Sequence, residues 1–211
     1  MPNVDVPNVQ VPDTHQHVEP GLRQRKQART RLELKAVADR LFDRDGFDHV
    51  TVDDICAEAD VSPRTFFRYF HNKGEIVFSG LQPRYDRVTS ELAARAADEP
   101  AFEALSHVIV DVLGDPGYER EAARIHRQIT GSPELMRASL ATYRTFLGQL
   151  VDLVVDRPPC NGDGQRARLL VGVVLVALET AVEQWGDDPD HPLRVELTTR
   201  LAQVAGVTHT L

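Results

Sequence analysis

The stretch of sequence that decides the fold is residues 51–73, which read TVDDICAEADVSPRTFFRYFHNK. Thr51 can cap a short helix, and the apolar Ile55 follows one turn further along it. A second helix can start soon afterwards, because Ser62 is a good N-cap and Pro63 suits the first helical position. The sequence therefore predicts two short helices joined by a turn of three or four residues, the second of which ends near position 70.

Two short helices joined this closely form a helix-turn-helix, which lays its second helix in the major groove of DNA. The packing requires a small side chain where the helices approach, and Cys56 provides it. The turn requires a residue that tolerates positive φ, and Asp60 is permitted there although Gly is more comfortable. Apolar residues that can hold the two helices together are also present: Ile55, Ala59, Val61, Phe66 and Phe70. All these requirements are met within residues 51–70, which therefore predict a DNA-binding head.

Helical spacing continues on both sides of this stretch. Upstream, apolar residues recur at three- and four-residue steps until Gly46, which ends a helix in the usual way. Downstream, Asn72 and Glu75 form a capping-box-like start for a fourth, longer helix. Breaks rich in Pro and Gly then predict five more helices, near 101–113, 118–130, 133–156, 165–185 and 192–206. We find no strand-like alternation of useful length, and we expect an all-α fold with about nine helices.

Composition divides the chain into three parts. Residues 1–20 contain four prolines and no sustained periodicity, so we expect a disordered tail there. His15 and His17 in that tail would make a poor metal site, and we expect neither a metal nor a cofactor. A three-helix head is expected over 21–72 and a larger helical body over 73–211.

Charge is distributed unevenly along the chain. The formal net charge of −8 would argue against a nucleic-acid partner if the charges were spread evenly along the chain, but they are not. Residues 23–35 hold six basic side chains against the single acid Glu33. These six are Arg23, Arg25, Lys26, Arg29, Arg31 and Lys35. A small basic zone is therefore joined to an acidic body.

Several classes of protein are disfavoured by the sequence. The longest uncharged apolar run, 169–178, is about half of what spans a bilayer, and no signal segment opens the chain, so we expect a cytoplasmic protein. The two cysteines are too few for a disulfide framework; we expect Cys56 to be buried and Cys160 to lie in an exposed loop. The common catalytic motifs of hydrolases, P-loop proteins and dinucleotide-binding enzymes are missing, so we do not expect an enzyme.

The head resembles that of TetR-type bacterial repressors. The resemblance covers about residues 25–80 and includes Leu41-Phe42-x3-Gly46-Phe47-x3-Thr51 before the decisive stretch. Its core is the run Thr51-x3-Ile55-Cys56-x2-Ala59-Asp60-Val61-Ser62-Pro63-Arg64-Thr65-Phe66-Phe67-Arg68-Tyr69-Phe70-His71-Asn72-Lys73. Further on, three segments resemble the branch with acyl-CoA-like ligand domains, which includes mycofactocin-system regulators: Ser132-Pro133-Glu134-Leu135, Arg166-Ala167-Arg168-Leu169-Leu170 and Trp185.

The resemblance implies a set of residues that contact DNA. They are Arg23, Arg25, Lys26, Arg29, Thr51, Ser62, Pro63, Arg64, Thr65, Phe67, Arg68, Tyr69 and Lys73. Positions 63–65 would reach base edges, whereas Thr51, Tyr69 and Lys73 would hold phosphates, and positions 23–29 would form an arm along the backbone or minor groove. This chain departs from the family pattern at Arg64, which replaces a small residue, and at Asp60, which replaces the usual turn Gly.

The resemblance also implies a body that dimerises and senses a ligand. Helix 165–185 is apolar nearly all round, and with helix 192–206 it would form the dimer interface. A small hydrophobic or acyl-CoA-like effector would release the dimer from a palindromic operator. Candidate pocket residues, most of which are equally good as ordinary core, are Phe102, His107, Ile109, His126, Ile129, Tyr143, Phe146, Leu150, Leu175 and Glu179. Two alternatives stay open: a ligand-independent DNA-binding dimer, and a helical protein-interaction module.

Overall fold

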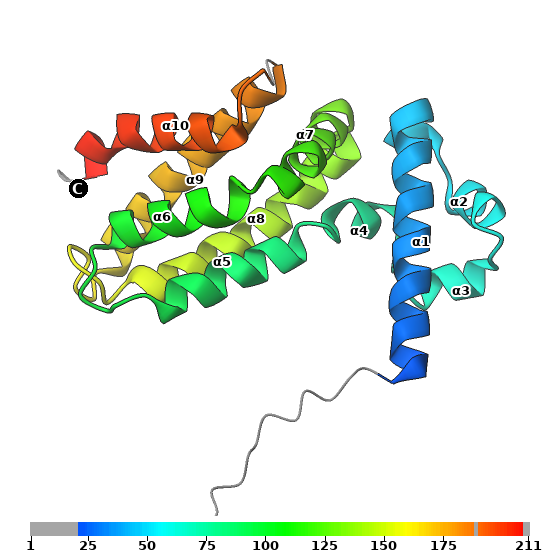
Figure 1. The fold of residues 1–211 in the computed structure, drawn as a ribbon, viewed down its shortest axis with the longest axis horizontal. Helices are drawn as coiled ribbons and strands as arrows, with labels where there is room; N and C mark the ends of the chain where they lie inside the picture. Colours follow the sequence, from blue (N-terminus) through cyan, green and yellow to red (C-terminus); the bar gives the residue numbers. More distant parts are fainter. Residues whose placement is uncertain (1–20, 188–189, 209–211) are drawn as a thin grey trace, which may run out of the picture.

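The computed structural model describes residues 21–187 and 190–208, and the tail expected over 1–20, including His15 and His17, lies outside them. The described residues form ten α-helices, one short 3-10 helix and no strand, so the prediction of an all-α fold is confirmed (Figure 1). In chain order the elements are α1 (Leu22–Asp45), η1 (Phe47–His49), α2 (Val52–Glu58), α3 (Pro63–Phe67), α4 (Lys73–Phe78), α5 (Gln82–Ala94), α6 (Ala101–Leu113), α7 (Pro116–Gly131), α8 (Pro133–Val154), α9 (Gly164–Asp187) and α10 (Leu193–Thr208).

The head, α1 to α4, is shaped by local turn and cap chemistry. Gly46 follows α1 at φ 83°, a left-handed conformation that only glycine adopts without strain. Thr51 and Asp54 form a complete capping box at the start of α2. Asp60 has φ 51°, as the turn between α2 and α3 requires, and the Val61 N–H closes that turn by donating to the Cys56 carbonyl at 3.0 Å. The expected helix-turn-helix geometry is therefore present.

The fourth helix differs from the prediction. Asn72 does cap it, accepting from the Glu75 N–H, but the helix ends at Phe78 and a second helix, α5, begins at Gln82. Pro83 lies at the start of α5. Because proline has no backbone N–H, it cannot donate the hydrogen bond to the Ser79 carbonyl that a continuous helix would require. The single helix expected here is thus two helices with a break at 79–81, next to the body.

The body packs α5 to α10 around one apolar core (Figure 1). Among the described residues, α9 is the segment long and apolar enough to span a membrane by length and composition. It packs against α6, α7, α8 and α10, so its apolar composition is explained by its position as a core helix. One side of α9 is nevertheless uncovered, because Leu169 and Val176 are both 56% exposed.

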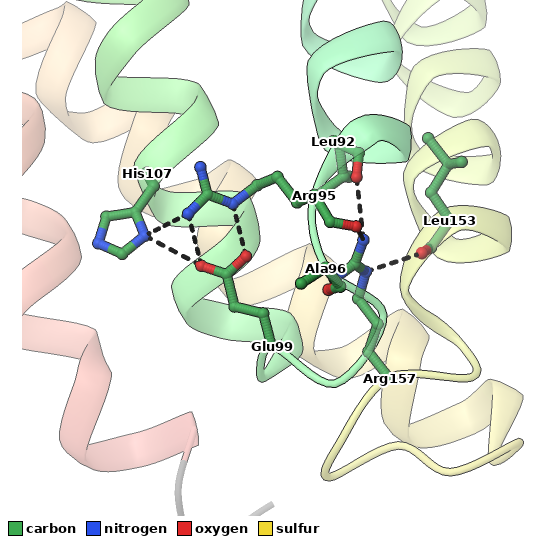
Figure 2. Close-up of polar contacts among 7 residues, drawn as sticks. All are labelled: Leu92, Arg95, Ala96, Glu99, His107, Leu153 and Arg157. Carbon is green, nitrogen blue, oxygen red and sulfur yellow. Dashed lines mark hydrogen bonds and ion pairs between the residues drawn. The ribbon is translucent and has the colours of Figure 1, made fainter.

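The corner between α5 and α6 is fixed by a buried arginine (Figure 2). The Arg157 guanidinium donates to the carbonyls of Leu92, Arg95 and Ala96, and also to that of Leu153 in α8, the helix that ends just before Arg157. These carbonyls lie at and just beyond the end of α5, where a helix offers few backbone donors, so Arg157 completes that helix end from a neighbouring element. The same loop corrects one expectation, because Cys160 is buried rather than exposed, and burial raises the pKa of its thiol.

Candidate nucleic-acid interface

The recognition helix α3 has one buried face and one exposed face. Ser62 caps it by accepting from the Thr65 N–H at 3.2 Å, and the Ser62 and Thr65 hydroxyls lie 3.0 Å apart. Phe66 is completely buried and packs against Phe70, with ring centroids 5.8 Å apart. The adjacent Phe67 is 55% exposed, which leaves an aromatic ring at the outer surface of the helix.

The exposed face carries the residues that could read DNA. Pro63, Arg64 and Phe67 are exposed there, and no intramolecular hydrogen bond or ion pair holds Arg64 within the described residues. Arg68 is arranged differently: its guanidinium donates to the Tyr69 hydroxyl at 3.1 Å and lies 4.9 Å from the centre of the Tyr69 ring. Arg64 is therefore the freer guanidinium, as a base-reading residue requires.

The basic start of α1 is connected to the end of α3 through Arg31. The Arg31 guanidinium donates to the Tyr69 carbonyl at 3.1 Å and lies 4.6 Å from the centre of the Phe70 ring. The DNA-contact candidates of α1, which are exposed, precede it on the same helix: Arg23, Arg25, Lys26 and Arg29. In the sequence, Arg31 is one of several basic residues. Its contacts with Tyr69 and Phe70 become visible only in the three-dimensional structure.

Thr51 is engaged in its own helix. Its hydroxyl donates to the Asp54 carboxylate at 2.6 Å, and its backbone N–H donates to the same oxygen at 2.9 Å. These two hydrogen bonds lower the pKa of Asp54. The hydroxyl expected to hold a phosphate thus serves as a cap in this structure, and phosphate contact at this position stays a prediction.

Lys73 is also engaged within the head. Its ammonium donates to the carbonyls of Phe47 and Val50 at 2.9 and 3.1 Å and lies 4.2 Å from the centre of the Phe47 ring. These bonds hold η1 and the residue just before Thr51. Lys73 therefore positions the start of α2, and the expected phosphate contact is not tested by the structure.

The ligand-contact candidates are dispersed over the body. Phe102 and Leu175 are buried, and Phe146 is buried against Tyr85, with the rings stacked at 3.9 Å between centroids. The half-buried His126 and Ile129 both lie on α7. Ile109 and Leu150, also considered, are fully buried core.

Two of those candidates lie at the surface of the single chain. The His107 side chain lies at the surface, where its Nδ1 is 3.3 Å from the Glu99 carboxylate and 3.2 Å from the Arg95 guanidinium (Figure 2). Glu179 lies on an exposed side of α9. Neither side chain lines an interior pocket in this structure, and ligand contact at these two positions stays a prediction. Burial on one face of a helix depends on its neighbours, which the sequence does not name.

Tyr143 belongs to an open groove on the outside of the body. The groove has a volume of about 690 Å³ and lies between α8, α9 and α10. Its walls are mostly apolar, and they are formed by Tyr143, Leu147, Gln165, Arg168, Leu169, Gly172, Val173, Val176 and Val204.

A capped helix-turn-helix with an exposed recognition helix, carried on an all-helical body, defines a DNA-binding transcriptional regulator. Residues 34–79 match the family described as bacterial regulatory proteins, tetR family. The chain is 31% identical over 174 residues to the HTH-type transcriptional regulator TcmR of Streptomyces glaucescens, covering 79% of this chain and 77% of that protein. The chain therefore belongs to the TetR family.

Two further similarities agree with this assignment. MftR of Mycobacterium tuberculosis, described as a mycofactocin biosynthesis transcriptional regulator, is 26% identical over 168 residues, covering 76% of this chain and 82% of that protein. The fold is similar to that of NalD, the secondary repressor of the MexAB-OprM multidrug efflux pump in Pseudomonas aeruginosa, with a TM-score of 0.62 and 16% identity. That match covers 85% of this chain and 95% of NalD, and at such low identity it supports the fold alone.

Proposed function

We propose that the protein is a homodimeric repressor that binds a palindromic operator and is released from it by a small hydrophobic or acyl-CoA-like effector. The observation that carries the proposal is the exposed face of α3, where Arg64 has no competing partner among the described residues and Phe67 is 55% exposed. Operator binding would place the protein in the cytoplasm.

Base reading is assigned to the leading part of α3. A guanidinium can pair with the O6 and N7 atoms of guanine through two hydrogen bonds, and we assign this role to the exposed Arg64. Phe67 can contact a thymine methyl group but has no hydroxyl for a phosphate. Positive charge for the DNA backbone, which adds affinity without sequence preference, would come from Arg68 just after α3 and from the basic residues of α1, Arg23, Arg25, Lys26 and Arg29.

Dimerisation is assigned to α9 and α10. Leu169, Gly172, Val173 and Val176 follow one another at helical spacing along the uncovered side of α9 and form one wall of the groove. A Cβ added to Gly172 would meet no atom within 4 Å, so this side of the helix is open in the single chain. An exposed apolar surface of this kind is typical of a subunit interface. A dimer also supplies the two recognition helices that a palindrome requires.

The effector class rests on the likeness of 132–135, 166–170 and Trp185 to the branch with acyl-CoA-like ligand domains. Binding in the body would change the relative orientation of the two heads, so that they no longer match the spacing of the half-sites. A coupling of about 1–3 kcal/mol between the two sites would change operator affinity by roughly 5- to 150-fold.

The test is a titration of the purified protein against its own upstream DNA and a scrambled duplex, at two salt concentrations, with and without palmitoyl-CoA. Selective binding that palmitoyl-CoA weakens supports the whole proposal. Selective binding that no acyl-CoA affects favours the ligand-independent dimer. Binding of both duplexes with equal affinity, followed by failure to select any sequence from a random library, contradicts the assignment of a sequence-specific regulator.

A further inference from the structure

The contact between α1 of the head and α7 of the body contains a cluster of four partly buried charges. Lys35 lies 2.9 Å from Asp39 on the same helix and 3.2 Å from Glu121 on α7. Arg124 lies 3.0 Å from Asp39 and 3.5 Å from Glu121. The four side chains are between 11% and 26% exposed, and their charges cancel. We call these four residues the α1–α7 cluster.

The contact continues along both helices beyond the cluster. Gln128, one turn further along α7, donates to Asp43 of α1 at 3.3 Å. Ser132, which caps α8, donates to Asp48 of η1 at 2.6 Å. The body therefore holds the head directly at α1 and η1, in addition to the covalent connection through α4 (Figure 1).

This contact is also where polar groups are least well satisfied. The described residues contain five buried side-chain polar atoms without a hydrogen-bond partner in the protein, and three of them lie here: Asp39 Oδ1, Arg124 Nε and Gln128 Oε1. A buried polar atom without a partner is costly, because it has given up its hydrogen bonds to water. A rearrangement of α7 against α1 is therefore less costly than the disruption of a fully satisfied interface.

The break between α4 and α5 lies against the same cluster. A Cβ added to Gly80 would overlap Glu121 Oε1 and would lie 3.3 Å from the Lys35 side chain. A displacement of this break would therefore press on the ion pair between the head and the body. Three elements meet at one point: the helix that leads into the recognition motif, the break that follows α4, and a helix of the proposed effector domain.

We propose that the α1–α7 cluster, together with Gly80, sets the orientation of the head on the body and so couples operator binding to the body. This inference rests on the proposed function and identifies its positioning residues. Specific binding requires the two heads to be held at one spacing. A head that is less firmly oriented loses more conformational freedom when it binds the operator, and this loss lowers the affinity for the operator. Binding to random DNA requires no fixed spacing and depends mainly on charge.

The central variant is Arg124→Gln, and Arg95→Gln is its matched control. Both changes remove one guanidinium that is paired with a carboxylate, but Arg95 pairs with Glu99 at the opposite end of α5 from the head (Figures 1 and 2). The net charge changes equally in the two variants. Gly80→Ala is a second variant, which would displace Glu121 without removing any charge and without requiring a left-handed backbone.

We expect Arg124→Gln and Gly80→Ala to raise the Kd for the selected operator about fivefold or more, with less than about a twofold change for scrambled DNA. Arg95→Gln should leave both values unchanged. If operator affinity is unchanged in Arg124→Gln and Gly80→Ala while their melting temperatures fall, the cluster only stabilises the fold and the inference is wrong.

A readout without DNA separates this inference from the proposed function. Spin labels at Glu58→Cys on α2 and Gln149→Cys on α8 report the distance between head and body when labelled protein is diluted with unlabelled protein. Cys56 and Cys160 are buried and burial raises the pKa of both thiols, which disfavours their labelling. A broader distance distribution in Arg124→Gln than in Arg95→Gln supports the inference, even if the wild type selects no operator. Identical distributions in the two variants would overturn it.

Discussion

The head and the body of this protein are specified in different ways. In the head, nearly every turn has a chemical reason in the sequence: a capping box at Thr51, a positive φ at Asp60, and a cap with a following proline at Ser62. In the body, helices pack because one face is apolar, and many arrangements satisfy that requirement. Recognition of DNA fixes the geometry of the head, whereas a sensing domain can retain its fold while its interior varies. The functional residues are therefore easier to identify in the head.

The largest effect on stability is expected when two adjacent aromatic residues of the head, Phe66 and Phe67, are compared. Phe66→Ala should lower the free energy of unfolding by about 3–5 kcal/mol, because Phe66 is completely buried. Phe67→Ala should change it by less than about 0.5 kcal/mol, because Phe67 is 55% exposed, and should instead weaken operator binding. Urea unfolding followed by circular dichroism measures both stabilities. Equal destabilisation by the two changes would contradict the two faces of α3.

The next effect is expected in the body. Arg157→Leu should lower the free energy of unfolding by about 2–3 kcal/mol, because three carbonyls at and just beyond the end of α5 lose a charged hydrogen-bond donor. Arg95→Gln, in the adjacent surface ion pair, should cost no more than about 1 kcal/mol. Chemical unfolding of both variants checks the order, and a larger loss in Arg95→Gln would show that the surface pair, not the buried guanidinium, holds the corner.

A third prediction distinguishes base reading from backbone contact within the head. Arg64→Ala should weaken operator binding by about 1–3 kcal/mol and leave binding to random DNA nearly unchanged. Arg29→Ala should weaken binding to both duplexes alike and make the salt dependence less steep. Fluorescence anisotropy titrations at several salt concentrations measure both quantities. If the two variants behave identically, the division between α3 and the start of α1 is incorrect.

The smallest expected effect concerns the cap of α2. Thr51→Ala should destabilise the protein by about 1 kcal/mol, whereas Thr51→Ser should retain most of the cap. The Thr51 hydroxyl is the main cause of the lowered pKa of Asp54, so this pKa should rise in Thr51→Ala. A lowered carboxylate pKa stabilises the folded state above the unfolded-state pKa, and this contribution is lost as the pH falls through the folded-state pKa. An NMR titration that finds the same Asp54 pKa in all three proteins would contradict this role.

Sequence reasoning predicted the head almost completely and the body only in outline. Caps and turns act over three or four residues, so Gly46, Thr51, Asp60 and Ser62 could be interpreted from neighbouring letters alone. The cap at Asn72 indicates where a helix begins but not where it ends, and the break at 79–81, just before Pro83, is therefore not predicted.

Residues that act through distant partners could not be predicted in this way. Arg31, Arg124 and Arg157 each contact a partner that lies between 38 and 85 positions away in the sequence. Such contacts depend on how the helices pack, which the sequence does not specify. Cys160 was expected at the surface because its loop is rich in Pro and Gly, yet the loop folds back and buries it. The exposure of the candidate pocket residues His107 and Glu179 likewise depends on which neighbouring helices cover them, and the sequence does not show this.

The most direct test of the account is selection of binding sites from a random duplex library by the purified wild-type protein and by Arg64→Ala. The wild type should enrich an inverted repeat whose half-sites are about one helical turn of DNA apart or slightly more. Arg64→Ala should relax the preference at one position in each half-site. Enrichment of no sequence by the wild type, or of the identical repeat with undiminished preference by both proteins, would contradict a recognition helix that reads bases through Arg64.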